Sequence, residues 1–153
     1  ERIPLFSDVL KVLDGVPVIC EIKAGIGDSA AEICEAVCSE IKDYAGFICI
    51  ESFNPFIIQW LRKNRPDIIR GQLSMNFIKN GNELGFLQSF LMTNLFVNVF
   101  SRPDYVAYRF EDNSFGYFLC RGIFNPLLAA WTVKGEQSRS KAEKLYDAVI
   151  FEE

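Results

Sequence analysis

A carboxylate and an amine stand two residues apart in the stretch VPVICEIK, at positions 16–23. If this apolar stretch is a strand, Glu21 and Lys23 lie on one face, because alternate side chains of a strand point the same way. Charges are rarely buried unless they are paired or coordinated, so this face should meet water, a metal or a ligand. A glutamate suits a hard divalent cation and a lysine suits a phosphate group. An exposed salt bridge of little energetic value explains the pair equally well.

Three more residues near the ends of expected strands could line such a site. Glu51 and Phe53 end the stretch GFICIESF, and Trp131 lies in LLAAWTV. In parallel α/β sheets and barrels, ligands bind outside the carboxyl ends of the strands. Glu51 is also explained as a solvated strand end, and Trp131 as a core aromatic residue. Gln72 and Tyr108, at the ends of two other expected strands, are weaker candidates.

Composition excludes several classes of function. The sequence has no histidine, which rules out a Ser-His-Asp or Cys-His catalytic device within these residues. The net charge is −4 and no cluster of lysine and arginine appears, so nucleic acid is not an expected partner. The five cysteines sit mostly in apolar segments, which fits buried thiols in a reducing compartment and a cytoplasmic location.

Short apolar runs alternate with helical patterns along the chain, which predicts a single domain over residues 1–153 built on a parallel sheet. The expected strands are 16–23, 46–53, 67–74, 103–110, 127–133 and 146–153. The expected helices are 8–13, one that begins at the capping box of Ser29 and Glu32, 55–62, 84–99, 114–121 and 137–145. Neither GxGxxG nor GxxxxGK[ST] occurs, so no nucleotide loop follows the first strand. The alternation suits part of a barrel as well as an open sheet.

The most apolar stretch, LGFLQSFLMTNLFVNVF at 84–100, is too short and too polar to span a bilayer. An amphipathic helix that touches a membrane surface is compatible with this pattern, but we expect the stretch to pack in the core.

Four motifs together resemble the C-terminal part of the glycerophosphodiester phosphodiesterase family. In order, they are IPLFSDVL followed by VPVICEIK, then FICIESFNPFIIQWLRKNRPDIIRGQLS, AAWTVKG, and YDAVIFEE. The resemblance implies a partial (β/α)8 TIM-type barrel that holds strands three to eight and lacks the first two. It also implies a phosphoric diester hydrolase of lipid metabolism that converts glycerophosphodiesters to an alcohol and glycerol 3-phosphate. The implied cofactor is a divalent cation, Mg²⁺ or Ca²⁺.

The resemblance assigns roles to individual positions. It makes Glu21 a metal ligand and Lys23 a catalytic residue that contacts the phosphate or the metal-site network. Phe53 and Trp131 match substrate-binding aromatics at the barrel mouth, and Glu51 could join Glu21. The family's H-R-G, E-x-D and H-D motifs, which belong to its first two strands, do not occur here.

The missing motifs lead us to assign catalysis to a full-length parent enzyme and to expect little from these residues alone. The alternative is a catalytically dead, barrel-derived module that binds a phosphodiester, a lipid headgroup or a protein partner. In either case, strands 16–23 and 146–153 would be exposed sheet edges, through which the chain could self-associate.

Overall fold

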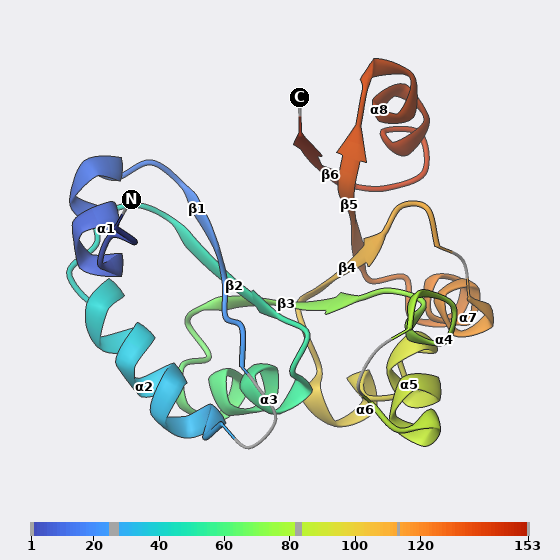
Figure 1. The fold of residues 1–153 in the computed structure, drawn as a ribbon, viewed down its shortest axis with the longest axis horizontal. Helices are drawn as coiled ribbons and strands as arrows, with labels where there is room; N and C mark the ends of the chain where they lie inside the picture. The colour runs from blue at the N-terminus through green and yellow to red at the C-terminus, as the bar shows by residue number, and fades with distance from the viewer. Residues whose placement is uncertain (1, 25–27, 82–83, 113, 153) are drawn as a thin grey trace.

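The computed structural model describes residues 2–24, 28–81, 84–112 and 114–152, and in them parallel strands alternate with helices (Figure 1). The strands form one six-stranded sheet in chain order, each parallel to the next. They are β1 Val18–Glu21, β2 Ile48–Ser52, β3 Ile69–Ser74, β4 Tyr105–Arg109, β5 Leu127–Lys134 and β6 Ala148–Glu152. The helices are α1 Phe6–Leu13, α2 Ala30–Ile41, α3 Pro55–Asn64, α4 Phe77–Asn80, α5 Phe86–Thr93, α6 Asn98–Ser101, α7 Phe115–Phe124 and α8 Glu136–Ala142.

The two faces of the sheet have different neighbours. On the outer face, Ile22 and Ile50 are buried against helix residues such as Leu61. On the inner face, Leu73 packs with Ala107 and other small or aromatic side chains. The sheet curls and does not close, because β1 and β6 each pair with one neighbour only. The expected fold class, part of a TIM-type barrel, is confirmed.

Helix starts follow the sequence signals. The side chain of Ser29 accepts a hydrogen bond from the backbone N–H of Glu32 at 3.3 Å, as the capping box requires. The side chain of Asn54 does the same for the N–H of Phe56 at 3.0 Å, with Pro55 at the first helical position. These caps fix where α2 and α3 begin after β1 and β2.

The prediction of one long helix over 84–99 is wrong. The chain forms α5 and α6 instead, because Asn94 ends α5 by bonding its side chain back to the carbonyl of Phe90 at 3.0 Å. Leu95 then adopts a positive φ of 60°, a left-handed conformation that no helix continues through. The short helix α4 was not expected from the sequence. The stretch is also only partly core: Leu95 and Val97 are buried, whereas several of its other apolar residues are exposed.

The open edges lead to a test of self-association. Ile19 lies on the edge strand β1 with 54% of its surface exposed, so an inward-pointing charge there should block pairing between chains. We expect Ile19→Lys to raise the monomer fraction in analytical ultracentrifugation at micromolar concentration. Val12→Lys, on a more exposed apolar site of α1, is the control and should change nothing. Equal association of Ile19→Lys and the unmodified chain would refute pairing through β1 and leave β6 as the edge that pairs.

Candidate functional site

Two carboxylates meet where β1 and β2 end. Glu21 and Glu51 are register partners on these adjacent strands. Glu51 is buried, with 6% of its surface exposed, and its Oε2 accepts a hydrogen bond from the Tyr105 hydroxyl at 2.9 Å. A buried carboxylate needs such a donor, so Tyr105 fixes the orientation of Glu51.

The bond is unusual because Tyr105 belongs to β4, two strands away from Glu51. Gly71 on β3 lies between them: it is the register partner of Glu51 on one side and of Tyr105 on the other. A Cβ at Gly71 would lie 2.2 Å from Cζ of Tyr105, so the ring occupies the space that any side chain would need. Glu21, Glu51, Gly71 and Tyr105 therefore form one lateral row across four strands, which we call the carboxylate row.

The electrostatics of the row favour a bound cation. Burial raises the pKa of the Glu51 carboxyl above its ordinary value, and the negative charge of Glu21 raises the same pKa further. The hydrogen bond from Tyr105 opposes this rise. A positive charge between the two carboxylates would relieve both their repulsion and the burial penalty of Glu51.

Lys23 lies beside Glu21, as the strand periodicity predicts. Its Nζ is 3.8 Å from Oε2 of Glu21, and 83% of the lysine side chain is exposed. At this distance and exposure the contact adds little to stability. Ile22, between them in sequence, points to the outer face and is buried. Lys23 thus presents an exposed ammonium group beside the first carboxylate of the row.

The two predicted substrate aromatics are in contact. The ring centroids of Phe53 and Trp131 lie 5.5 Å apart at an interplanar angle of 83°, although β3 and β4 separate their strands. Phe77 stacks edge-on to Phe53 at 6.0 Å. Trp131 Nε1 donates to the carbonyl oxygen of Ala107 at 3.0 Å, which fixes the indole. Together they form an apolar wall on the inner face.

The weaker candidates Gln72 and Tyr108 have structural roles. Gln72 is fully buried and its amide donates to the carbonyls of Ser52 and Phe53. The Tyr108 hydroxyl donates to the carbonyl of Thr93 at 3.1 Å on the outer face. Neither side chain joins the carboxylate row or the aromatic wall.

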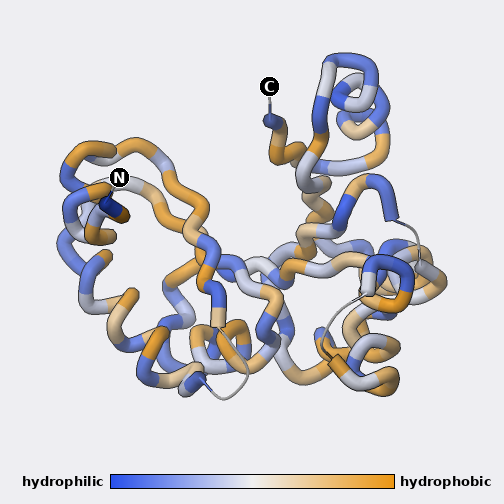
Figure 2. The backbone as a smooth tube through the Cα atoms, viewed as in Figure 1, coloured by the Kyte–Doolittle hydropathy of each residue, from blue (hydrophilic) through white to orange (hydrophobic). Residues whose placement is uncertain are grey.

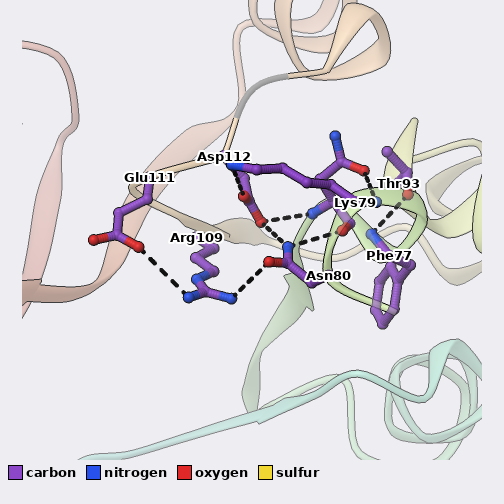
Figure 3. A network of polar contacts seen from close by, with 8 residues as sticks. Phe77, Lys79, Asn80, Thr93, Arg109, Glu111 and Asp112 are labelled. Atoms are coloured by element: carbon purple, nitrogen blue, oxygen red, sulfur yellow. Dashed lines mark hydrogen bonds and ion pairs between the residues drawn. The ribbon is translucent and has the colours of Figure 1, made fainter. Parts of the chain in front are cut away.

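The sequence analysis did not single out Arg109, a positively charged side chain at this end of the sheet. Arg109 ends β4 as the register partner of Trp131, and its guanidinium donates to Oδ1 of Asn80 at 3.2 Å (Figure 3). Asn80 donates in turn to the buried carboxylate of Asp112 at 2.7 Å. Glu111 lies 3.5 Å from the guanidinium. The charged run RFED, which begins at the last residue of β4, was the available signal.

The residues fit part of a site for the divalent cation that the resemblance implies. Among the described residues, no group of three or more His, Cys, Asp or Glu side chains is placed to hold a metal ion. Glu21 and Glu51 supply carboxylate oxygens, the ligand type that Mg²⁺ and Ca²⁺ prefer, but these cations take six or more oxygens. Two carboxylates of this chain would therefore hold such an ion only with further oxygens from water, substrate or other residues.

Comparisons with known proteins identify the fold. Neither a scan of protein-family models nor a search of curated proteins matches the sequence. A phosphodiesterase from Oleispira antarctica, solved with the product sn-glycerol-3-phosphate, matches with a TM-score of 0.70 and 16% identity. The match covers 97% of this chain and 57% of that one.

Two further structures agree. One is a protein from Silicibacter pomeroyi DSS-3 named as a glycerophosphoryl diester phosphodiesterase, with a TM-score of 0.69, 16% identity, and coverage of 95% of this chain and 52% of that one. The other is a glycerophosphodiester phosphodiesterase from Parabacteroides distasonis, with a TM-score of 0.58, 14% identity, and coverage of 95% and 57%. The chain thus spans about half the length of these structures. Its six strands have the fold of the corresponding part of a glycerophosphodiester phosphodiesterase barrel.

Proposed function

We propose that this chain is part of a phosphoric diester hydrolase that converts glycerophosphodiesters to an alcohol and glycerol 3-phosphate. The observation that carries the proposal is the carboxylate row beside Lys23, placed at the carboxyl ends of strands where barrel enzymes bind ligands. The fold agrees, since structures with the same fold are phosphodiesterases and one of them binds sn-glycerol-3-phosphate. We assign the activity to the full-length protein.

The proposed roles follow from position and chemistry. Glu21 and Glu51 contribute oxygens to a divalent cation, Mg²⁺ or Ca²⁺, and Tyr105 keeps Glu51 oriented toward it. When bound, that cation polarises a phosphoryl oxygen of the substrate. Lys23 meets the phosphate charge from the exposed side of the row. Phe53 and Trp131 offer an apolar surface to the carbon chain of the glycerol unit.

A second candidate function is a binding module without catalysis. It is favoured by the absence of histidine from the sequence, because no imidazole is present for proton transfer to the leaving alcohol. In this case the same row and wall would bind a phosphodiester, a lipid headgroup or a protein partner and release it unchanged.

Chelation separates the two functions. We expect the full-length protein to release glycerol 3-phosphate from glycerophosphocholine or glycerophosphoethanolamine, to lose this activity in EDTA, and to regain it with Mg²⁺ or Ca²⁺. The physical reason is that the phosphodiester anion and the two carboxylates repel one another unless a cation lies between them. Activity that is indifferent to EDTA would contradict the metal role. Binding without turnover would favour the module.

A further inference from the structure

The helices that link β3 to β4 and β4 to β5 expose an unusual amount of apolar surface. We call it the α5–α7 surface, and its exposed apolar residues are Phe86, Leu87, Phe90, Phe96, Val99, Phe115, Phe118, Leu119, Ile123 and Phe124. Their exposed fractions reach 78% at Phe86 and 76% at Phe115. In Figure 2 these helices, which lie at the lower right as in Figure 1, carry much of the hydrophobic colour.

The surface extends over more than one helix. Phe96, Val99, Leu119 and Phe124 line one groove of about 590 Å³, so the α5–α6 loop, α6 and α7 contribute to the same feature. The Phe90 and Phe96 rings lie 5.9 Å apart and extend it toward α5.

Close packing of Gly116 on Asn94 fixes α7 against the end of α5. The N–H of Gly116 donates to Oδ1 of Asn94 at 3.0 Å, and a Cβ at Gly116 would lie 2.1 Å from the Asn94 carbonyl oxygen. The helices are therefore held together as one platform.

Its charge is of one sign. In the segments 84–103 and 114–126 the only ionisable side chains of Asp, Glu, Lys or Arg are Arg102 and Arg121, although the whole chain carries a net charge of −4. Neither arginine takes part in an ion pair with another described residue. Arg102 lines the groove itself. Asp104 also lines it, but both of its carboxylate oxygens accept hydrogen bonds from Arg70.

The apolar residues and the two arginines indicate what covers the α5–α7 surface. A symmetric pair of chains would place the same patch on both sides, so Arg102 and Arg121 would meet only apolar side chains and one another, because segments 84–103 and 114–126 hold no Asp or Glu. A strand added at β1 or β6 would not cover the surface either, because its helices connect the middle strands of the sheet. An anionic bilayer offers both an apolar interior and negative headgroups. Among the described residues, no helix is long and apolar enough to cross a membrane.

We propose that the α5–α7 surface docks on an anionic lipid bilayer. Exposed phenylalanines, Phe115, Phe118 and Phe124 among them, enter the boundary between headgroups and acyl chains, while Arg102 and Arg121 meet headgroup phosphates. The interaction goes beyond the proposed hydrolase activity and does not depend on it, because none of these residues belongs to the carboxylate row or the aromatic wall.

Vesicle co-sedimentation tests the proposal on the purified chain. We expect stronger binding to phosphatidylcholine vesicles that contain a quarter phosphatidylglycerol than to phosphatidylcholine alone, with a preference that falls as salt rises. Each basic residue near an anionic surface changes binding by roughly fivefold, so Arg102→Gln with Arg121→Gln should weaken binding to the mixed vesicles by at least ~10-fold. Binding to phosphatidylcholine alone should hardly change in this variant.

A second variant tests the apolar part. Phe118→Ser with Phe124→Ser should lower binding to both kinds of vesicle by at least ~10-fold, because the apolar area that enters the bilayer is lost. Val12→Ser, at an apolar site on α1 that is more exposed than either phenylalanine, is the control and should bind like the unmodified chain. Circular dichroism verifies that each variant is folded.

Three outcomes would overturn the proposal: no vesicle binding by the folded chain, equal binding by all variants, or loss of binding in the control. A fourth would replace lipid by a second copy. In that outcome the chain does not bind vesicles but forms a dimer in ultracentrifugation without vesicles. The dimer persists in Ile19→Lys and disappears in Phe118→Ser with Phe124→Ser.

Discussion

Glu21→Gln should lower kcat/KM of the full-length protein for glycerophosphocholine by at least ~100-fold, because a first ligand of a catalytic cation would lose its charge. Glutamine keeps the shape of the side chain, so the fold and the contact with β2 should remain. Isothermal titration of Mg²⁺ or Ca²⁺ should show weaker binding in the same variant, which separates a lost ligand from a general loss of structure.

Glu35→Gln is the matched control for that experiment. Glu35 is an exposed carboxylate on α2, a helix that packs on the outer face of the sheet, opposite the carboxylate row. Its replacement should leave both kcat/KM and cation binding unchanged. A loss under roughly threefold in Glu21→Gln would instead return Glu21 to the role of a surface salt-bridge partner of Lys23.

Gly71→Ala should destabilise the chain by about 1–3 kcal/mol, the usual range for a side chain forced into occupied space. The new methyl group would overlap the Tyr105 ring, whose Cζ and hydroxyl lie 2.2 and 2.6 Å from the ideal Cβ position. The ring must move, and Glu51 then loses its hydrogen bond while still buried. Urea unfolding followed by circular dichroism measures the change in the free energy of unfolding.

A double-mutant cycle identifies the cause. Tyr105→Ala removes the ring, so adding Gly71→Ala to it should destabilise much less than Gly71→Ala does alone. Gly122→Ala on α7 is the control for a glycine-to-alanine change. Apart from the backbone of its own helix and its chain neighbours, nothing lies within 4 Å of the added Cβ, and alanine favours helix, so this variant should be neutral or slightly stabilised. Additive effects of Gly71→Ala and Tyr105→Ala would mean that the ring and the methyl group do not compete.

The elements and part of the site could be predicted because their causes are local. Strand alternation placed Glu21 beside Lys23, and the capping signals at Ser29 and Asn54 set the starts of α2 and α3. The rule that ligands bind at strand ends identified Phe53 and Trp131 as candidate binding-site residues. Their contact confirms only that they are neighbours, and their proposed binding role stays a prediction.

The parts that could not be predicted depend on register and on distant contacts. The Tyr105–Glu51 bond joins residues 54 positions apart and exists only because Gly71 lies between them in the sheet. The break after α5 depends on Asn94, whose side chain also accepts a hydrogen bond from Gly116 on α7. No local pattern in the sequence reports either partner.

The glycine in the carboxylate row also acts on how the sheet assembles. Alternation of side chains forbids β3 from slipping by one residue, since every side chain would change face. A slip by two residues keeps the faces, and alternation alone allows it. It would, however, place Ile69 or Leu73 under the Tyr105 ring, where only a hydrogen atom fits. Gly71 thus selects the register of β3 against β4 during folding. Among the alignments that keep each side chain on its native face, only the one with Gly71 opposite Tyr105 leaves room for the ring.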